Sequence, residues 1–239
     1  MQKSTSILYF DKEGRENLPQ VLRIVKRTLT KRPELRKLKL IIFTATGEGP
    51  ALACAQLHEF APKIIAVTFP PNFSVTRGAE TQFPHVTERL RSFFNGVGVS
   101  VITARLPFDP ISKADAHNTE MQLVKEVLTI FAGGFSLCIQ AVLSACDHGE
   151  VAVGEMVLSL TGDVAALVTA SSSEKFLSKT EALVVNEILC KPRNLTISKK
   201  LTTVSNAPSH KVLSADGPSE KVLGMVLSPL IKPPTKDEV

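Results

Sequence analysis

The sequence is poor in aromatic residues other than phenylalanine: it has no tryptophan and one tyrosine, and aromatics make up 5% of its 239 residues. This bears on its positive charge. Residues 1–40 hold 11 Lys/Arg and 4 Asp/Glu (+7), whereas the remaining residues hold 17 and 19 (−2). A surface that binds nucleic acid typically interleaves aromatic side chains with basic ones. Only Tyr9 and Phe10 lie near these bases, so the composition favours a solvated helix face and we expect no nucleic-acid partner.

Long apolar runs are also missing. None approaches the ~20 residues that span a membrane, and the apolar patch in the N-terminal segment MQKSTSILYFDKEG is too short for a signal peptide. We therefore expect a cytoplasmic protein with no membrane partner. The four cysteines lie in apolar segments without CxxC spacing, which favours buried reduced thiols over disulfides or zinc. They are Cys54, Cys138, Cys146 and Cys190.

Catalytic signatures are absent as well: the chain has no GxSxG, HExxH or Walker pattern. An enzyme would have to use polar titrating residues near predicted strand and helix ends. Five such residues are candidates: Asp109, His117, Asp147, His148 and Asp163. A metal site is a further alternative in the 109–120 segment, where four possible ligands fall close together, but their spacing matches no ligand motif and a capped helix start explains them equally well. These four are Asp109, Asp115, His117 and Glu120.

The stretch LKLIIFTATGEGP, residues 38–50, is the most informative part of the chain. An apolar run at 40–43 predicts a strand, the residues Thr44 to Gly49 predict a tight loop, and Pro50 suits the first turn of a following helix. A loop rich in hydroxyls and glycine that leads into a helix N-terminus collects unpaired N–H groups and positive dipole charge. The stretch therefore predicts a phosphate site, in which Thr44 and Thr46 would donate hydroxyl hydrogen bonds and Gly47 and Gly49 would let backbone N–H groups approach.

Apolar segments alternate between strand and helix patterns along the chain. Apolar residues at three- and four-residue steps predict helices from about 17 to 32, 50 to 60, 84 to 95, 121 to 131 and 135 to 146, and short apolar runs predict strands between and after them. This pattern predicts a three-layer α/β/α sandwich with a mostly parallel sheet. The late strands at 157–160 and 165–169 lack an intervening helix, so we expect antiparallel pairing at one edge.

Further candidate site residues follow predicted strands. Arg77 lies in the loop after a strand at 64–69, so it is a candidate anion clamp, although a plain surface arginine fits the sequence too. Thr161 and the Ser171–Ser173 run each follow a later strand and could line the far wall of the site. The pair Gly133–Gly134 separates two helices, and a close helix junction explains it better than a second phosphate loop.

Several segments, taken in order, resemble the stand-alone proteins similar to the C-terminal allosteric domain of pyruvate kinase. They are YFDKEGRENLPQVLRI, IIFTATGEGPAL, FSLCIQAVLSACDHGEVAVGEMVLSLTG, AALVTA and EILCKPR. The resemblance covers roughly residues 5–193 and implies a three-layer fold with about five mostly parallel strands. It implies no pyruvate kinase activity, because that chemistry belongs to a barrel domain absent here. The effector-phosphate loop of the family corresponds to Thr44, Thr46, Gly47 and Gly49. Glu48 departs from that pattern, as does Gln140, where the stand-alone relatives carry glutamate.

These observations lead to an expected organisation and three functional hypotheses. Residues 1–193 form the α/β domain, and 194–239 form a C-terminal extension that packs back or reaches a partner subunit. The favoured hypothesis is a regulatory or non-catalytic domain that binds a phosphorylated metabolite or a nucleotide such as flavin mononucleotide (FMN) at the 44–50 loop. The alternatives are an enzyme acting on such a ligand and an oligomerising structural partner, a homo-oligomer being one form of it.

Overall fold

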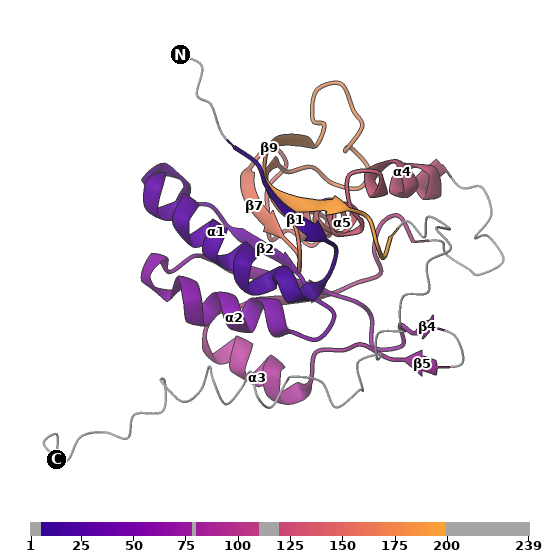
Figure 1. The fold of residues 1–239 in the computed structure, drawn as a ribbon, viewed down its shortest axis with the longest axis horizontal. Coiled ribbons are helices and arrows are strands. Elements are labelled where there is room, and N and C mark those ends of the chain that lie inside the picture. Colours follow the sequence, from indigo (N-terminus) through magenta and orange to yellow (C-terminus); the bar gives the residue numbers. More distant parts are fainter. Residues whose placement is uncertain (1–5, 78–79, 110–119, 199–239) are drawn as a thin grey trace, which may run out of the picture.

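The computed structural model describes residues 6–77, 80–109 and 120–198. Its centre is a seven-stranded sheet in the order β1-β9-β8-β7-β2-β3-β6, in which only β8 runs against the others. The strands are β1 (Leu8–Lys12), β2 (Leu40–Phe43), β3 (Ile64–Thr68), β6 (Ser100–Thr103), β7 (Met156–Leu160), β8 (Ala165–Thr169) and β9 (Val184–Asn194). The α/β class and the mostly parallel sheet are confirmed. The strand number exceeds the expected five because the first and last strands join as a parallel pair at one end of the sheet (Figure 1).

The two central strands explain why the fold has three layers. Every residue of β2 and β3 is buried, as expected for parallel strands covered on both faces. Because side chains alternate along a strand, Leu40 and Ile42 pack into one hydrophobic core, whereas Ile41 and Phe43 pack into the other.

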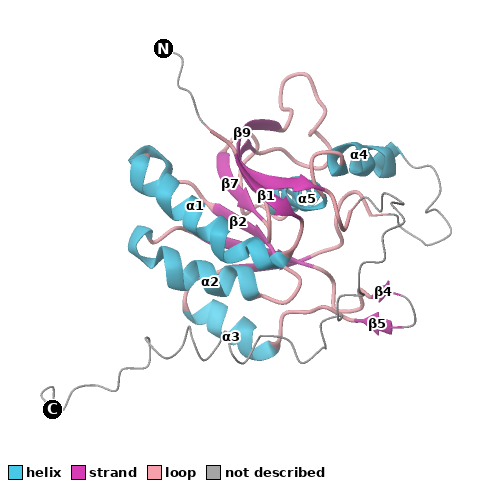
Figure 2. Cartoon of the chain, in the orientation of Figure 1, coloured by secondary structure: helices cyan, strands magenta, loops and turns pink. Residues whose placement is uncertain are grey.

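Three helices cover the first face: α1 (Leu18–Lys31), α2 (Glu48–Leu57) and α3 (Glu88–Gly96). Figure 2 shows them side by side on one side of the sheet. The apolar stripe predicted for α1 is the buried one: Leu18, Val21, Leu22, Val25 and Leu29. Asn17 precedes the helix, but its side chain accepts no hydrogen bond from the first turn, and its Nδ2 donates to the Lys12 carbonyl at 2.9 Å. Three 3₁₀ turns complete this side: η1 (Arg15–Asn17), η2 (Pro33–Leu35) and η3 (His58–Phe60).

Two helices cover the second face. Helix α5 (Gly133–Asp147) lies directly on the sheet and is buried along most of its length. Helix α4 (Glu120–Thr129) packs on its outside and contains no fully buried residue. A separate two-stranded hairpin, β4 (Val75–Arg77) with β5 (Glu80–Gln82), follows β3. The late strands pair antiparallel as expected, β8 lying between β7 and β9.

The remaining global expectations concern the membrane, the cysteines and the extension. Within the described ranges, no helix is long and apolar enough to cross a membrane. Cys138 and Cys190 are fully buried, and Cys54 and Cys146 are half-buried. Strand β9 ends at Asn194, and of the expected extension only residues 194–198 belong to the described part of the chain.

The three layers predict that two consecutive residues of β2 are equally important for stability. Ile41→Ala and Ile42→Ala should each lower the free energy of unfolding by about 2–5 kcal/mol, because each leaves a cavity in a different core. Val184→Ala, at a position on β9 that is 47% exposed, is the control and should cost at most about 0.5 kcal/mol. Urea denaturation measures all three. A cost below that of the control at either isoleucine would mean that one face of the sheet is not covered.

Candidate functional site

The carboxyl edge of the sheet has a topological switch point between β2 and β7. These strands are parallel neighbours, yet the chain leaves β2 through α2 toward β3 and leaves β7 through a hairpin toward β8. The loops after the two strands therefore diverge, and open α/β sheets bind ligands in the crevice that such loops leave. Residues 44–47 and 161–163 lie at this point.

A hydrogen bond between Thr44 and Gly47 closes the loop that follows β2. Thr44 is buried, its N–H donates to the Val67 carbonyl at 2.9 Å, and its Oγ1 accepts the Gly47 N–H at 2.9 Å. Helix α2 begins immediately afterwards at Glu48, two residues before the expected start at Pro50. Thr46 is half-buried beside it. The predicted order of strand, tight loop and helix is therefore confirmed.

Both glycines of this loop have a packing reason to be glycine. Gly47 has φ 89°, a conformation that side chains disfavour, and a Cβ there would lie 3.1 Å from Leu90 of α3. A Cβ at Gly49 would lie 2.9 Å from Cγ2 of Ile42. The fold thus requires both residues whether or not a phosphate binds, which the sequence pattern alone did not reveal.

The N-terminus of α2 keeps backbone donors that the described protein does not use. No side chain caps it, the Ala51 N–H donates to the Gly47 carbonyl at 3.2 Å, and Pro50 has no N–H. Within the described ranges, the amides of Glu48 and Gly49 are the donors left over in the first turn. Such donors and the helix dipole attract an anion.

Arg15 supplies a positive charge at this helix start. Its Nη1 lies 3.9 Å from Oε2 of Glu48, and the two side chains are 42% and 25% exposed. Its backbone also meets the other loop of the switch point, since a Cβ built at Gly162 would lie 3.0 Å from the Arg15 Cα. The sequence analysis did not single out Arg15. The predicted alternative, Arg77, ends β4 in the separate hairpin, so its role as an anion clamp stays a prediction.

A buried hydroxyl accompanies the loop on the neighbouring strand. Val67 pairs with Phe43 in the β2–β3 ladder, so Thr68 is the lateral neighbour of Thr44 and, by alternation, faces the α2 layer with it. Thr68 is fully buried, and its Oγ1 has no hydrogen-bond partner in the structure. An unpaired buried hydroxyl costs free energy, and such groups concentrate at functional sites and water positions. Thr68 carries no sequence signal of its own, because it ends an otherwise apolar strand.

Thr161 and Ser171 were both predicted to line the far wall of the site, but only Thr161 lies at the carboxyl edge. Thr161 follows β7, is buried, and its Oγ1 donates to Oδ1 of Asp163 at 3.4 Å. The prediction for Ser171 is wrong. Because β8 runs antiparallel to β7, Thr169 pairs with Met156 at the start of β7, and Ser171 lies at the opposite edge, where its Oγ donates to the Glu181 carbonyl at 2.7 Å.

Two buried carboxylates occupy the start of α5 at the same edge. Glu13 Oε1 accepts the Gly133 N–H at 3.0 Å and the Ser198 hydroxyl at 2.5 Å, and its Oε2 accepts the N–H groups of Ile197 and Ser198 at 2.7 and 2.8 Å. Asp163 Oδ2 accepts the Gly14 N–H at 3.0 Å. The protein's own carboxylate thus takes the position that a phosphate would take at this helix.

The glycine pair 133–134 is therefore a close junction rather than a phosphate loop. A Cβ at Gly134 would overlap Oδ1 of Asp163 and would approach the Thr161 hydroxyl to 2.7 Å. Only a glycine at this position lets the Asp163 carboxylate lie against the first turn of α5.

The environments of the two carboxylates shift their pKa values in opposite directions. Burial raises the pKa of Asp163 to about 6, and the nearby Glu13 carboxylate adds to the rise, while the Gly14 N–H opposes it. Burial would also raise the pKa of Glu13, but the hydrogen bonds from Ser198, Gly133 and Ile197 together hold it below the ordinary value.

The five candidate catalytic residues are not brought together. Asp147 and His148 lie at the far end of α5 from Asp163, about 22 Å away along a helix of this length. Asp109 follows β6, three strand spacings or about 14 Å from β7, and its carboxylate pairs with Lys125 at 2.6 Å. His117 lies outside the described residues. Of the described candidates, only the sequence neighbours Asp147 and His148 lie at the same place, at the C-terminal end of α5, and neither lies at the carboxyl edge with Asp163.

The metal alternative stays a prediction, because two of its four residues lie outside the described part of the chain, whereas the position of Gln140 is known. Asp115 and His117 lie outside the described residues, and within those residues no three His, Cys, Asp or Glu side chains form a group that could hold a metal ion. Gln140 is buried inside α5, where its Oε1 accepts the Phe108 N–H at 2.9 Å. It thereby fixes the loop after β6 to the second helical layer.

The raised pKa of Asp163 predicts a pH-dependent stability. A carboxyl whose folded pKa lies above its unfolded value stabilises the fold when protonated, and this contribution is lost as pH rises from about 4 through 6. Asp163→Asn keeps an oxygen for the Gly14 N–H and removes the titration. Its stability relative to the native protein should therefore rise by about 2–3 kcal/mol between pH 4 and 7.

Denaturant titrations at several pH values measure this difference, and Asp11→Asn, which removes an exposed carboxylate from β1, controls for the general loss of a negative charge. A difference between Asp163→Asn and the native protein that stays constant from pH 4 to 7 contradicts the prediction.

Comparisons with known proteins add no family to this geometry. Neither a scan against protein-family models nor a search of curated proteins finds a match for the chain.

Proposed function

We propose that this protein is a non-catalytic or regulatory domain that binds a phosphorylated small molecule at the N-terminus of α2. The observation that carries the proposal is the coincidence of unused donors and charge at the switch point. The amides of Glu48 and Gly49, the Arg15 guanidinium and the Thr44 loop all lie there. Phosphate groups bind where helix N–H donors and an arginine converge, because both kinds of hydrogen bond gain from charge.

The buried hydroxyl of Thr68 supports the same location. It lies on the strand beside Thr44 and lacks a partner, although a valine there would avoid the cost of an unpaired polar group. The retention of the unpaired Thr68 hydroxyl on the strand beside Thr44 therefore supports a polar site at the carboxyl edge of the sheet.

Glu48 is compatible with the proposal through its pairing with Arg15. A carboxylate in the first turn already interacts favourably with the helix dipole, so it competes with an anionic ligand. The guanidinium carries five donors, and the Arg15 to Glu48 distance of 3.9 Å exceeds that of a good hydrogen bond. Arg15 therefore retains donors for a phosphate without releasing Glu48.

The ligand class follows from these groups and from the resemblance to the pyruvate kinase C-terminal domain, whose corresponding loop holds an effector phosphate. A phosphorylated metabolite or a nucleotide, FMN included, presents the required group. We place this function in the cytoplasm, without pyruvate kinase activity. The separation of the candidate catalytic residues supports binding rather than turnover.

Thermal shift and calorimetry with phosphorylated compounds test the proposal. The panel contains inorganic phosphate, a sugar bisphosphate, nucleoside phosphates and FMN, with riboflavin as the matched ligand that lacks the phosphate. We expect at least one phosphorylated compound to raise Tm and its unphosphorylated counterpart to have no effect. Arg15→Gln should weaken binding about tenfold or more, since a hydrogen bond to a charged group contributes roughly 1.5–3 kcal/mol.

The matched control is Arg27→Gln, because Arg27 is an exposed arginine of α1 that lies nine residues, or about 14 Å, beyond the start of that helix. Gly47→Val is unsuitable as a test, since the positive φ of Gly47 would strain the fold itself. The proposal fails if no phosphorylated compound shifts Tm, or if Arg15→Gln binds as tightly as Arg27→Gln.

Self-association is a second candidate function, favoured by the outer face of α4. Met121, Val124 and Leu128 pack inward against the second core, yet the helix also presents an exposed apolar stripe. It comprises Leu123 and Val127 of α4 and continues into Ile130 and Phe131 of the turn that follows the helix. Exposed apolar surface of this kind commonly marks a protein contact.

This helix is too short to supply the ~800 Å² per partner of a standard interface, so the expected association is weak. Light scattering over a range of concentrations should show a dimer at the highest concentrations, and Leu123→Lys, at a side chain that is 67% exposed, should abolish it. A monomer at all concentrations would remove this candidate.

A further inference from the structure

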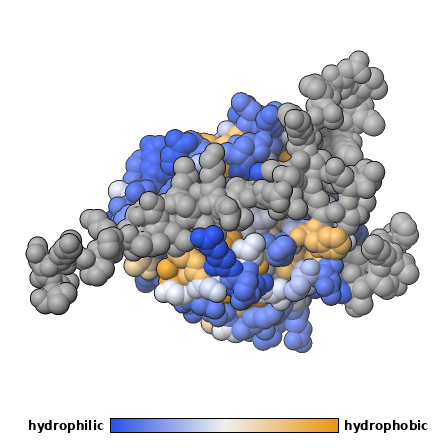
Figure 3. All heavy atoms as spheres, turned by 90° about the horizontal axis from the view of Figure 1, so that it is seen from below, coloured by the Kyte–Doolittle hydropathy of each residue, from blue (hydrophilic) through white to orange (hydrophobic). Residues whose placement is uncertain are grey.

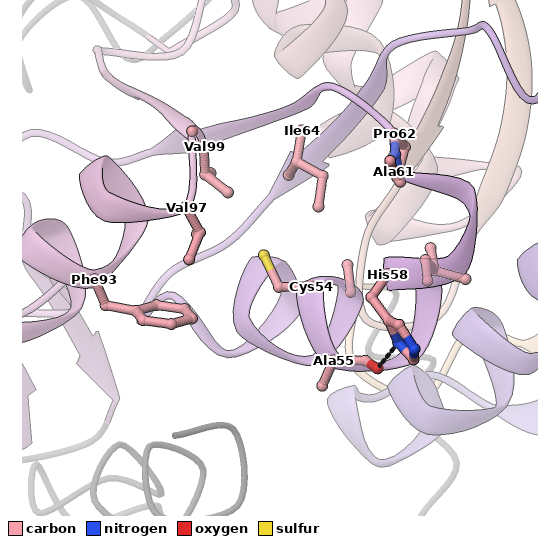
Figure 4. Close-up of a pocket in the computed structure, with 12 residues that line it drawn as sticks. Cys54, Ala55, His58, Ala61, Pro62, Ile64, Phe93, Val97 and Val99 are labelled. Atoms are coloured by element: carbon pink, nitrogen blue, oxygen red, sulfur yellow. Dashed lines mark hydrogen bonds between the residues drawn. The ribbon is translucent and has the colours of Figure 1, made fainter. Parts of the chain in front are cut away.

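An apolar groove lies between α2 and α3, away from the carboxyl edge. Its volume is about 580 Å³, within the roughly 300–1,000 Å³ of typical ligand pockets. Cys54 and Ala55 of α2 form one wall, Phe93 and Val97 form the other, and Ile64 and Val99 close the far side (Figure 4). The sulfur of Cys54 points into the groove.

The groove offers an occupant little polar chemistry. The imidazole of His58 lies at its end, where Nδ1 is bonded to the Ala55 carbonyl at 2.9 Å. Val97 is 44% exposed, and Phe93 is only partly buried. The face of the molecule that includes α3 shows apolar side chains between hydrophilic ones (Figure 3). A site of this composition suits aliphatic side chains better than a charged metabolite.

The chain itself contains a matching segment outside the described residues. Residues 222–231, VLGMVLSPLI, are the most apolar part of the sequence beyond Ser198 and follow a polar stretch. The described chain ends at Ser198, which is held on Glu13. The intervening residues 199–221 span up to ~80 Å when extended. The groove lies toward the C-terminal end of α2, and this helix extends only about 15 Å from the carboxyl edge, where Ser198 is held. The segment therefore reaches the groove.

We propose that residues 222–231 of the same chain dock in the groove between α2 and α3. Tethering gives this segment a millimolar effective concentration at the groove, which favours it over any free apolar partner. Docking removes from water both the apolar run and the exposed parts of Phe93 and Val97, which is the driving force for association. The extension then covers the helical face that carries the first core.

Disulfide trapping in the full chain tests the proposal. Cysteine is introduced at one position at a time, as Leu223→Cys, Met225→Cys, Leu227→Cys or Leu230→Cys. The dilute protein is oxidised with copper phenanthroline in air, and peptide mass spectrometry identifies the pairs. A disulfide forms only when the two Cα atoms approach within about 7 Å. We expect at least one variant to form an intrachain disulfide with Cys54.

The chain provides a matched internal control. Burial raises the pKa of both the Cys54 and the Cys146 thiols to about 11, and both are half-buried, but Cys146 lies in α5 on the other side of the sheet. Pairing with Cys54 should exceed pairing with Cys146 at least tenfold. Ser205→Cys, in the polar stretch of the same extension, should show no such preference.

A second pair of variants links the cross-link to the groove. Val97→Glu places a charge on its wall and should reduce cross-linking at least fivefold, whereas Val184→Glu, at a similarly exposed valine of β9, should leave it unchanged. Interchain disulfides at Cys54 would assign the groove to a second copy and overturn the proposal. Equal pairing with Cys54 and Cys146, or cross-linking that ignores Val97→Glu, would overturn it as well.

Discussion

The hydrogen bonds of two buried carboxylates at the start of α5 hold the carboxyl edge of the sheet together. Glu13 connects the end of β1, the first turn of α5 and the segment at 197–198, and Asp163 connects the β7–β8 loop to Gly14. These four segments come from both ends and the middle of the chain. The carboxylates accept the Gly133 N–H at the start of α5 and the Gly14 N–H after β1, and they thereby satisfy the helix terminus and position β1. The loop that carries Arg15 is fixed as a result.

This arrangement distinguishes the two helix N-termini at the switch point. Both helices begin beside the carboxyl edge. Helix α2 follows Gly47, and α5 begins with Gly133 and Gly134. At the start of α5, Glu13 accepts the Gly133 N–H, so a carboxylate of the protein already occupies that helix start. The first turn of α2 has no side-chain cap among the described residues, and its neighbours are Arg15 and the unpartnered Thr68 hydroxyl. The proposed function depends on this difference, because backbone donors that the protein leaves unpaired remain available to an anionic ligand.

Local sequence was sufficient for the parts of the fold that depend on periodicity. The stripe of α1, the strand, loop and helix at 40–57, and the antiparallel late strands all follow from patterns within a few residues. The site was harder, because its contacts are long-range: Gly14 and Asp163 are 149 positions apart. Arg15, Glu13 and Thr68 carry no motif, and their roles appear only when β1 pairs with β9 and β3 lies beside β2. The expectation for Ser171 was wrong because it conflicted with the antiparallel pairing expected for the late strands: a strand that runs against β7 ends at the opposite edge of the sheet from Thr161.

Amide chemical shifts measured during a titration with inorganic phosphate test the difference between the two helix starts most directly. Two-dimensional NMR spectra of the ¹⁵N-labelled full chain report each N–H separately. The account predicts saturable shifts at Gly47, Glu48 and Gly49, with none at Gly133 or Gly134, whose surroundings the carboxylates already fill. Shifts centred on Gly133, or no saturable shift at any residue of the 44–49 loop, would contradict it.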